Sequence, residues 1–174
     1  MCSSDLKDVR YEFGCPHPES LPDIGFHHSD TNNFGVYLWG SDPAKKHWAG
    51  WGSTTNSTTN STTNLTAAES ISPTGGNGPC RFHLGYALEE RAGQPTGPFQ
   101  NIVRVDGVPT VSDGPMTLTA RGMLDRTVSI ELPPGDHSLE VRLDDPNAVR
   151  ETIEGNNGGL VRYILEGKCG RLRP

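Results

Sequence analysis

The sequence lacks a long apolar run, and this absence limits what it can do at a membrane. No stretch of about 18 apolar residues occurs in the 174-residue chain, so the sequence predicts no membrane-spanning helix. Only 33% of the residues are hydrophobic, whereas the chain contains 21 glycines and 14 prolines. This composition is typical of many short strands joined by tight turns, with poorly packed segments attached.

Positive charge is scarce as well. The formal net charge is −6, and between Gly135 and Asn157 six carboxylates stand against two arginines. Such a surface would repel a polyanion, and no basic stripe occurs elsewhere in the chain. The sequence therefore excludes nucleic acid as an expected partner.

Catalytic motifs are also missing. The chain has no Gly-x-Ser-x-Gly elbow, no phosphate-binding glycine loop and no His-Glu-x-x-His zinc motif. His27 and His28 are adjacent, and on a strand they would point to opposite faces, so at most one could join Asp30 in a site. We therefore expect a protein that is not an enzyme.

Cysteines are few, and their spacing excludes a zinc ribbon or a thioredoxin-like motif. Cys80 and Cys169 lie just before the first clear strand and just after the last one. A disulfide between them would join the two ends of one domain in an oxidising compartment, whereas reduced thiols are the alternative. The cysteines by themselves leave both states open.

Alternation of apolar and polar residues dominates the chain from Arg81 onward. Five segments show this period of two, which is typical of half-buried strands: 82–89, 116–121, 127–132, 138–143 and 161–166. Asp106-Gly107 predicts a hairpin turn between two further short strands. One-faced strands need a second sheet to cover them, so we predict an all-β fold, an immunoglobulin-like antiparallel β-sandwich of about seven strands with a Trp-rich N-terminal extension.

The remaining chain divides by composition. Residues 1–6 resemble one reading frame of a sequencing adapter joined to environmental DNA, and an ordinary polar tail is the alternative. We assign residues 7–52 to a Trp-rich segment and residues 53–66, which contain a Ser-Thr-Thr-Asn repeat, to a linker or exposed loop. The sandwich is expected over residues 67–168, with a tail over residues 169–174.

Aromatic residues concentrate in the Trp-rich segment. Trp39, Trp48 and Trp51 fall close together, with Tyr37 beside them. Aromatic faces stack on the apolar faces of sugars, so these four residues are candidate ligand-binding residues for a polysaccharide. The alternative is that they are core or domain-junction residues.

A loop rich in Asp, Glu and Asn precedes the final predicted strand. Its carboxylate and amide oxygens are of the kind that calcium prefers, and the candidate metal ligands are Asp144, Asp145, Asn147, Glu151 and Glu154. The alternative is structural, because Asp and Asn side chains also hold tight turns by accepting backbone hydrogen bonds. We expect no cofactor, and calcium is the alternative that this composition allows.

The same region carries a family resemblance. After Pro133-Pro134-Gly135 and a strand, the chain shows a spaced set of residues: Asp145, Asn147, Val149, Glu151, Glu154, Asn156 and Asn157. This pattern resembles CARDB, the cell-adhesion-related domain of bacterial secreted proteins. The resemblance implies an immunoglobulin-like sandwich and favours the structural interpretation of the loop.

Three functional hypotheses follow. The first is a non-catalytic accessory module, for adhesion, binding or spacing, in a larger secreted or surface bacterial protein. Its partners would be an extracellular protein, a polysaccharide or other domains of the same parent chain. The alternatives are a carbohydrate-binding module that uses the Trp-rich segment, and a truncated accessory part of a secreted hydrolase.

Overall fold

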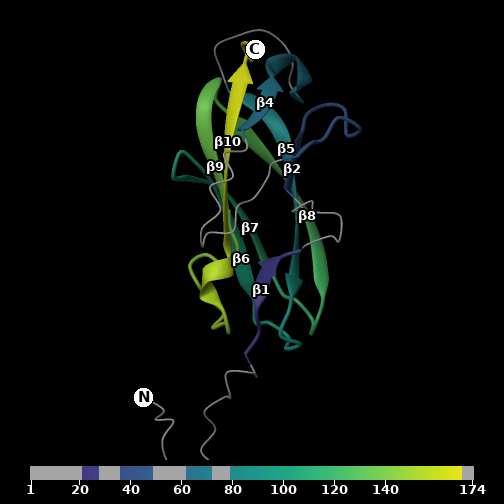
Figure 1. Ribbon diagram of the computed structural model, residues 1–174, viewed down its shortest axis with the longest axis vertical. Coiled ribbons are helices and arrows are strands. Elements are labelled where there is room, and N and C mark those ends of the chain that lie inside the picture. Colours follow the sequence, from purple (N-terminus) through teal and green to yellow (C-terminus); the bar gives the residue numbers. More distant parts are fainter. Residues whose placement is uncertain (1–20, 28–35, 49–61, 72–78, 170–174) are drawn as a thin grey trace, which may run out of the picture.

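The fold is a two-layer β-sandwich, which confirms the predicted fold class. The structure is a computed structural model and describes residues 21–27, 36–48, 62–71 and 79–169. Figure 1 shows the two sheets as adjoining layers, with β9 and β10 in one and β5 and β8 in the other.

The first sheet is built around its longest strand, β5 (Cys80–Glu90). Along one edge, β5 pairs antiparallel with β8 (Met123–Leu132) over almost its whole length. Its other edge is shared by β1 (Ile24–Phe26) and β2 (Val36–Trp39), and β2 pairs in turn with β3 (His47–Trp48). Three strands thus flank β5, and their outward side chains share one outer face of the sheet.

The second sheet has the strand order β4-β10-β9-β6-β7. Its strands are β4 (Thr62–Thr66), β10 (Gly158–Glu166), β9 (Gly135–Arg142), β6 (Phe99–Val105) and β7 (Val108–Met116). Every pair is antiparallel except β4 with β10, which is parallel. A short 3₁₀ turn, η2 (Ala67–Glu69), follows β4, and another, η3 (Glu154–Asn156), precedes β10.

The core lies between the sheets and follows the predicted alternation. On β5 the side chains of Phe82, Leu84 and Leu88 are buried, whereas Arg81 and His83 lie on the outer face. A disulfide joins Cys80 at the start of β5 to Cys169 just after β10, with 5.0 Å between the two Cα atoms. Since β5 and β10 belong to different sheets, this bond ties the two layers together.

The domain boundaries differ from the prediction. Residues 62–66, assigned to a linker, form β4, because β10 offers a free edge and β-branched threonines suit an extended chain. Only Leu65 is apolar there, so the repeat shows no apolar alternation that could signal a strand. Within the Trp-rich segment, β1, β2 and β3 belong to the first sheet.

The strand predicted over residues 116–121 was also wrong. β7 ends at Met116. The side chain of Leu118 beyond it is still buried, but the backbone of Leu118 is hydrogen-bonded to Thr96 rather than to a neighbouring strand. A turn in which Gly122 donates to the carbonyl of Thr119 then reverses the chain. Residues 1–6 and 170–174 and most of the repeat lie outside the described residues.

Candidate functional site

The outer face of the first sheet carries an aromatic pair on β2. Val36 and Leu38 are buried, so the alternation of the strand turns Tyr37 and Trp39 outward, where both are half-buried. Tyr37 pairs with Gly85 across the ladder, and Trp39 pairs with His83. The two aromatic rings therefore lie over the middle of β5.

Gly85 leaves room on β5 for one edge of the Trp39 indole ring. A Cβ atom at this position would sit 2.6 Å from Cζ3 and 2.7 Å from Cη2 of Trp39. The ring thus occupies the space that a side chain on β5 would fill. The His83 ring lies beside it, with 5.4 Å between the ring centroids and an interplanar angle of 35°.

A lysine covers the aromatic pair from the turn that follows β2. Asp42 opens this turn: its side chain accepts from the N–H of Ala44 at 2.9 Å, and its carbonyl accepts from that of Lys45 at 3.0 Å. The chain then brings the Nζ of Lys46 to 4.9 Å from the Trp39 ring centroid and 5.9 Å from that of Tyr37. Both distances fall within the range of cation–π attraction.

These residues border a cleft of about 370 Å³ on the sheet surface. It runs across β2, β5 and β8, and its lining residues are His27, Tyr37, Trp39, Lys46, Gly85, Tyr86, Ala87, Asp125, Arg126 and Thr127. A cleft of this size, with aromatic walls and a few polar groups, suits a small ligand or one segment of a polymer.

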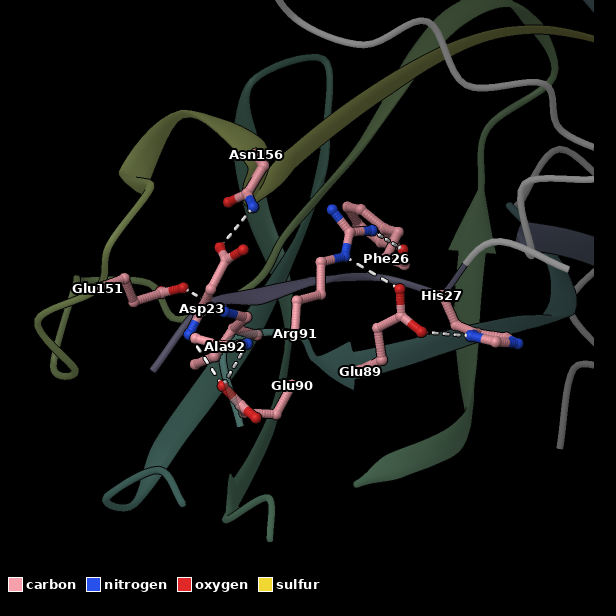
Figure 2. Close-up of polar contacts among 10 residues, drawn as sticks. Asp23, Phe26, His27, Glu89, Glu90, Arg91, Ala92, Glu151 and Asn156 are labelled. Atoms are coloured by element: carbon pink, nitrogen blue, oxygen red, sulfur yellow. Dashed lines mark hydrogen bonds and ion pairs between the residues drawn. The ribbon is translucent and has the colours of Figure 1, made fainter. Parts of the chain in front are cut away.

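A chain of polar contacts fixes His27 at the end of β1. Figure 2 shows the imidazole pointing away from β1 beyond Glu89, whose carboxylate lies 2.6 Å from Nδ1. Arg91 donates to the same carboxylate at 3.0 Å and also to the carbonyl of Phe26. Burial alone would raise the pKa of Glu89, but the hydrogen bonds from His27 and Arg91 hold it below its usual value.

A buried polar network supports the floor of the cleft. Tyr86 donates to Asp113 at 2.5 Å, Arg126 forms an ion pair with the same carboxylate, and Asn101 donates to the Tyr86 hydroxyl at 2.8 Å. Burial and the bond to Asp113 raise the pKa of Tyr86. Burial would raise the pKa of Asp113 too, but its bonds to Arg126 and Tyr86 lower it. The network connects the two sheets, and its two charged groups, Arg126 and Asp113, neutralise each other.

The acidic loop directs its first carboxylate at its own backbone. Asp144 is 3% exposed and adopts a left-handed backbone with φ of 47°. Its two carboxylate oxygens accept from the N–H groups of Ala148 at 3.0 Å and Val149 at 2.8 Å. Burial raises its pKa, although these two bonds oppose the shift. Asp145 forms an ion pair with Arg104.

The rest of the loop holds the N-terminal strand in place. Glu151 accepts from the N–H of Ile24 at 2.5 Å, and Asn156 donates to Asp23 at 2.7 Å, as Figure 2 shows. Thr152 donates its backbone N–H to the carbonyl of Pro22 at 2.9 Å. Burial raises the pKa of Glu151 to about 7, even though the Ile24 bond favours its ionised form. The loop is thus a clamp on the chain just before and within β1.

A second carboxylate, Glu90, closes the same end of the sandwich. It is 2% exposed and accepts from the backbone N–H groups of Asp23, Ala92, Gly93, Gln94 and Arg121. Burial would raise the pKa of Glu90, but these bonds lower it.

Four of the five predicted metal ligands border one cleft, and the fifth lies apart from it. A second cleft of about 400 Å³ touches Asp144, Asp145, Asn147 and Glu154, while Glu151 faces β1 instead. Glu154 accepts from the backbone of Glu151 at 2.9 Å. Within residues 21–27, 36–48, 62–71 and 79–169, no group of three or more His, Cys, Asp or Glu side chains could hold a metal ion.

The predicted aromatic ligands are brought together in part. Tyr37 and Trp39 border one cleft, and the backbone of Trp48 pairs with Tyr37 in the ladder between β2 and β3. Trp51 lies outside the described residues.

Sequence reasoning missed Lys46 and Gly85. A lysine in a polar turn carries no signal of its own. A glycine within an alternating strand does, because it often marks the close approach of another group.

Comparison with known proteins supports the fold. No protein-family profile and no curated protein matches the sequence. The solution NMR structure of the CARDB domain of PF1109 from Pyrococcus furiosus is similar, with a TM-score of 0.50 at 14% identity, covering 84% of this chain and 96% of that chain. The crystal structure of that domain, in complex with di-metal ions, has a TM-score of 0.51 at 11% identity, covering 95% of this chain and 100% of that chain.

A domain of a candidate cell surface protein from Methanosarcina acetivorans is less similar. Its TM-score is 0.40 at 18% identity, over 52% of this chain and 81% of that one, and it carries no argument. The two Pyrococcus structures show that this chain has the β-sandwich fold of CARDB domains.

Proposed function

We propose that this chain is a non-catalytic accessory module of a secreted or surface protein, and that it binds carbohydrate in the cleft over β2, β5 and β8. The single observation that carries the proposal is the indole of Trp39 resting on Gly85. An aromatic ring whose edge is seated against a rigid sheet is held in one orientation, and such a ring can pack against the apolar C–H face of a pyranose.

The polar groups around the cleft add to this interpretation. Asp125 and Thr127 are exposed on β8, beside the strand that carries Gly85. Carboxylate and hydroxyl groups at the border of an aromatic surface can bind sugar hydroxyls and fix the orientation of the ring.

The disulfide supports a location outside the cytosol. Structural disulfides form and persist in oxidising compartments, and this one joins the two sheets. Among the described residues, no helix is long and apolar enough to cross a membrane. The fold shared with CARDB domains fits an accessory role by analogy.

A bound metal is not part of the proposal. The Pyrococcus domain was crystallised with di-metal ions, but the acidic loop of this chain does not fit such a group. Both oxygens of Asp144 accept backbone N–H groups, and Asp145 neutralises Arg104. Hard cations need carboxylate oxygens that are free to converge on them.

The test is binding of the full chain to soluble oligosaccharides, measured by isothermal titration calorimetry. Trp39→Ala should lower the affinity at least tenfold, because the stacking surface is lost. Leu160→Ala removes another exposed apolar side chain, 58% exposed on the second sheet, and should leave the affinity unchanged. Wild-type affinity in Trp39→Ala, or no binding to any oligosaccharide, would contradict the proposal.

A further inference from the structure

Among the described basic residues that border the cleft, Lys46 is the one without a counter-ion. Of the basic residues bordering the cleft, Arg126 turns its side chain to the inner face of the sheet, where it pairs with Asp113, and His27 is bonded to Glu89. No carboxylate among the described residues forms an ion pair with Lys46. Its ammonium group lies instead over two aromatic rings.

This arrangement fixes where a negative group would bind. The rings of Tyr37 and Trp39 keep water from one side of the ammonium, so an anion that approaches from the open side is attracted more strongly than at a free lysine. Because the ammonium group lies within 6 Å of both ring centroids, one molecule can pack a ring beside these aromatic groups and pair an anion with Lys46.

The cleft also has a negative end. Asp125 lies on β8, while Lys46 leads into β3 beyond β2, so β5 and β2 separate the two sides. Three strand spacings correspond to roughly 14 Å, enough room for a sugar ring between a cation and a hydrogen-bond acceptor. An anion is favoured on the Lys46 side and hydroxyl groups on the Asp125 side.

We infer that the cleft selects an acidic sugar, a hexuronic acid unit whose carboxylate pairs with Lys46 while its ring packs against the aromatic pair. The inference rests on the proposed carbohydrate site and specifies its ligand. Because the whole chain carries a net charge of −6, attraction of an anion must come from this local arrangement and not from the overall field.

The experiment compares two ligands that share their sugar rings and differ at the carboxylate. Trigalacturonic acid and its methyl ester present the same ring, with and without the carboxylate charge. Calorimetric titration of the full chain should give at least tenfold tighter binding of the acid in low salt, and the difference should shrink as salt screens the ion pair.

Matched variants then locate the charge. Lys46→Met keeps the length and apolar stem of the side chain, and should bring the two affinities to within about threefold of each other. Lys45→Met removes the neighbouring exposed charge and should leave the preference intact. Melting temperatures equal to wild type show that each variant is folded.

The results separate this inference from the proposed function. Equal affinity of the wild-type protein for acid and ester, or an unchanged preference in Lys46→Met, overturns the selection of an acidic sugar. If Trp39→Ala still abolishes binding of both ligands in that case, the carbohydrate site stands. If Trp39→Ala binds both as tightly as wild type, or wild type binds neither, both proposals fail.

Discussion

The acidic loop and the aromatic cleft both have the composition of a binding site, but their side chains are used in opposite ways. In the loop, Asp144 and Glu151 accept hydrogen bonds from backbone groups of this chain. In the cleft, Tyr37, Trp39 and Lys46 contact one another on an outer sheet face. The difference shows that residues of the kind that bind ligands form a site only when their polar groups are not already bonded within the protein.

The local backbone explains why the two regions differ. Asp144 sits at the start of a tight turn with a left-handed φ, where a short carboxylate side chain reaches N–H groups a few residues ahead. Tyr37 lies on an extended strand, where alternation sends every second side chain away from the core.

The largest effect is expected from removing the first carboxylate of the loop. Asp144→Ala leaves the N–H groups of Ala148 and Val149 without their acceptor and places alanine at a positive φ, so it should cost about 2–4 kcal/mol of unfolding free energy. Asp144→Asn keeps one acceptor oxygen and tolerates this φ, and should cost less than half as much. Urea denaturation measures both; equal stability of Asp144→Ala and wild type would refute the structural role.

A smaller effect is expected from pH acting on Glu151. Its pKa is about 7 in the folded chain and near 4.5 as a free side chain, so between these values the folded protein holds a proton that the unfolded chain has released. Raising the pH through this interval therefore favours unfolding, by on the order of 1–3 kcal/mol. Below about pH 4.5 and above about pH 7 this contribution no longer changes with pH.

Glu151→Gln isolates this contribution. Urea denaturation at pH 5 and pH 8 should show a smaller fall in stability for the variant than for wild type. A remaining fall is expected from His137, whose pKa is raised by its bond to Asp106 and which therefore stabilises the fold at the lower pH. Equal falls in variant and wild type would show that Glu151 is not protonated in the fold.

A third effect concerns the cleft alone. Gly85→Ala places a methyl group 2.6 Å from a ring carbon of Trp39, so the indole must tilt away from the sheet. We expect a three- to tenfold loss of sugar affinity, a changed near-ultraviolet circular dichroism spectrum and less than about 1 kcal/mol change in stability. Gly97→Ala is the control, since a Cβ there meets nothing within 4 Å.

The smallest effect is expected from calcium. Because the loop carboxylates already accept hydrogen bonds, adding millimolar calcium or chelator should leave the melting temperature of the full chain within about 1 °C. A calcium-dependent rise of several degrees would mean that the loop rearranges to bind the ion and that the comparison with the cleft fails.

The sequence predicted the strands whose two faces differ in polarity. β5, β8, β9 and β10 all follow the alternation of apolar and polar residues. β4 escaped notice because a Thr-rich repeat gains its structure from pairing with β10, which is distant in sequence. β1 and β3, with three and two residues, are too short to establish a period.

The candidate site was predictable in its aromatic half only. Trp39 and Tyr37 stand out by composition, whereas Lys46 and His27 reach the cleft through a turn and through the docking of β1. Those contacts depend on residues far apart in the sequence, such as Glu151 holding Ile24, and no local pattern encodes them.

The most direct test of the difference between the two regions is a titration of the ¹⁵N-labelled full chain with trigalacturonic acid, followed by amide chemical shifts. The account predicts that shift changes concentrate in residues 36–48, 83–87 and 125–127, which surround the cleft, and leave residues 144–157 unmoved. Changes centred on residues 144–157, with none around Trp39, would contradict it.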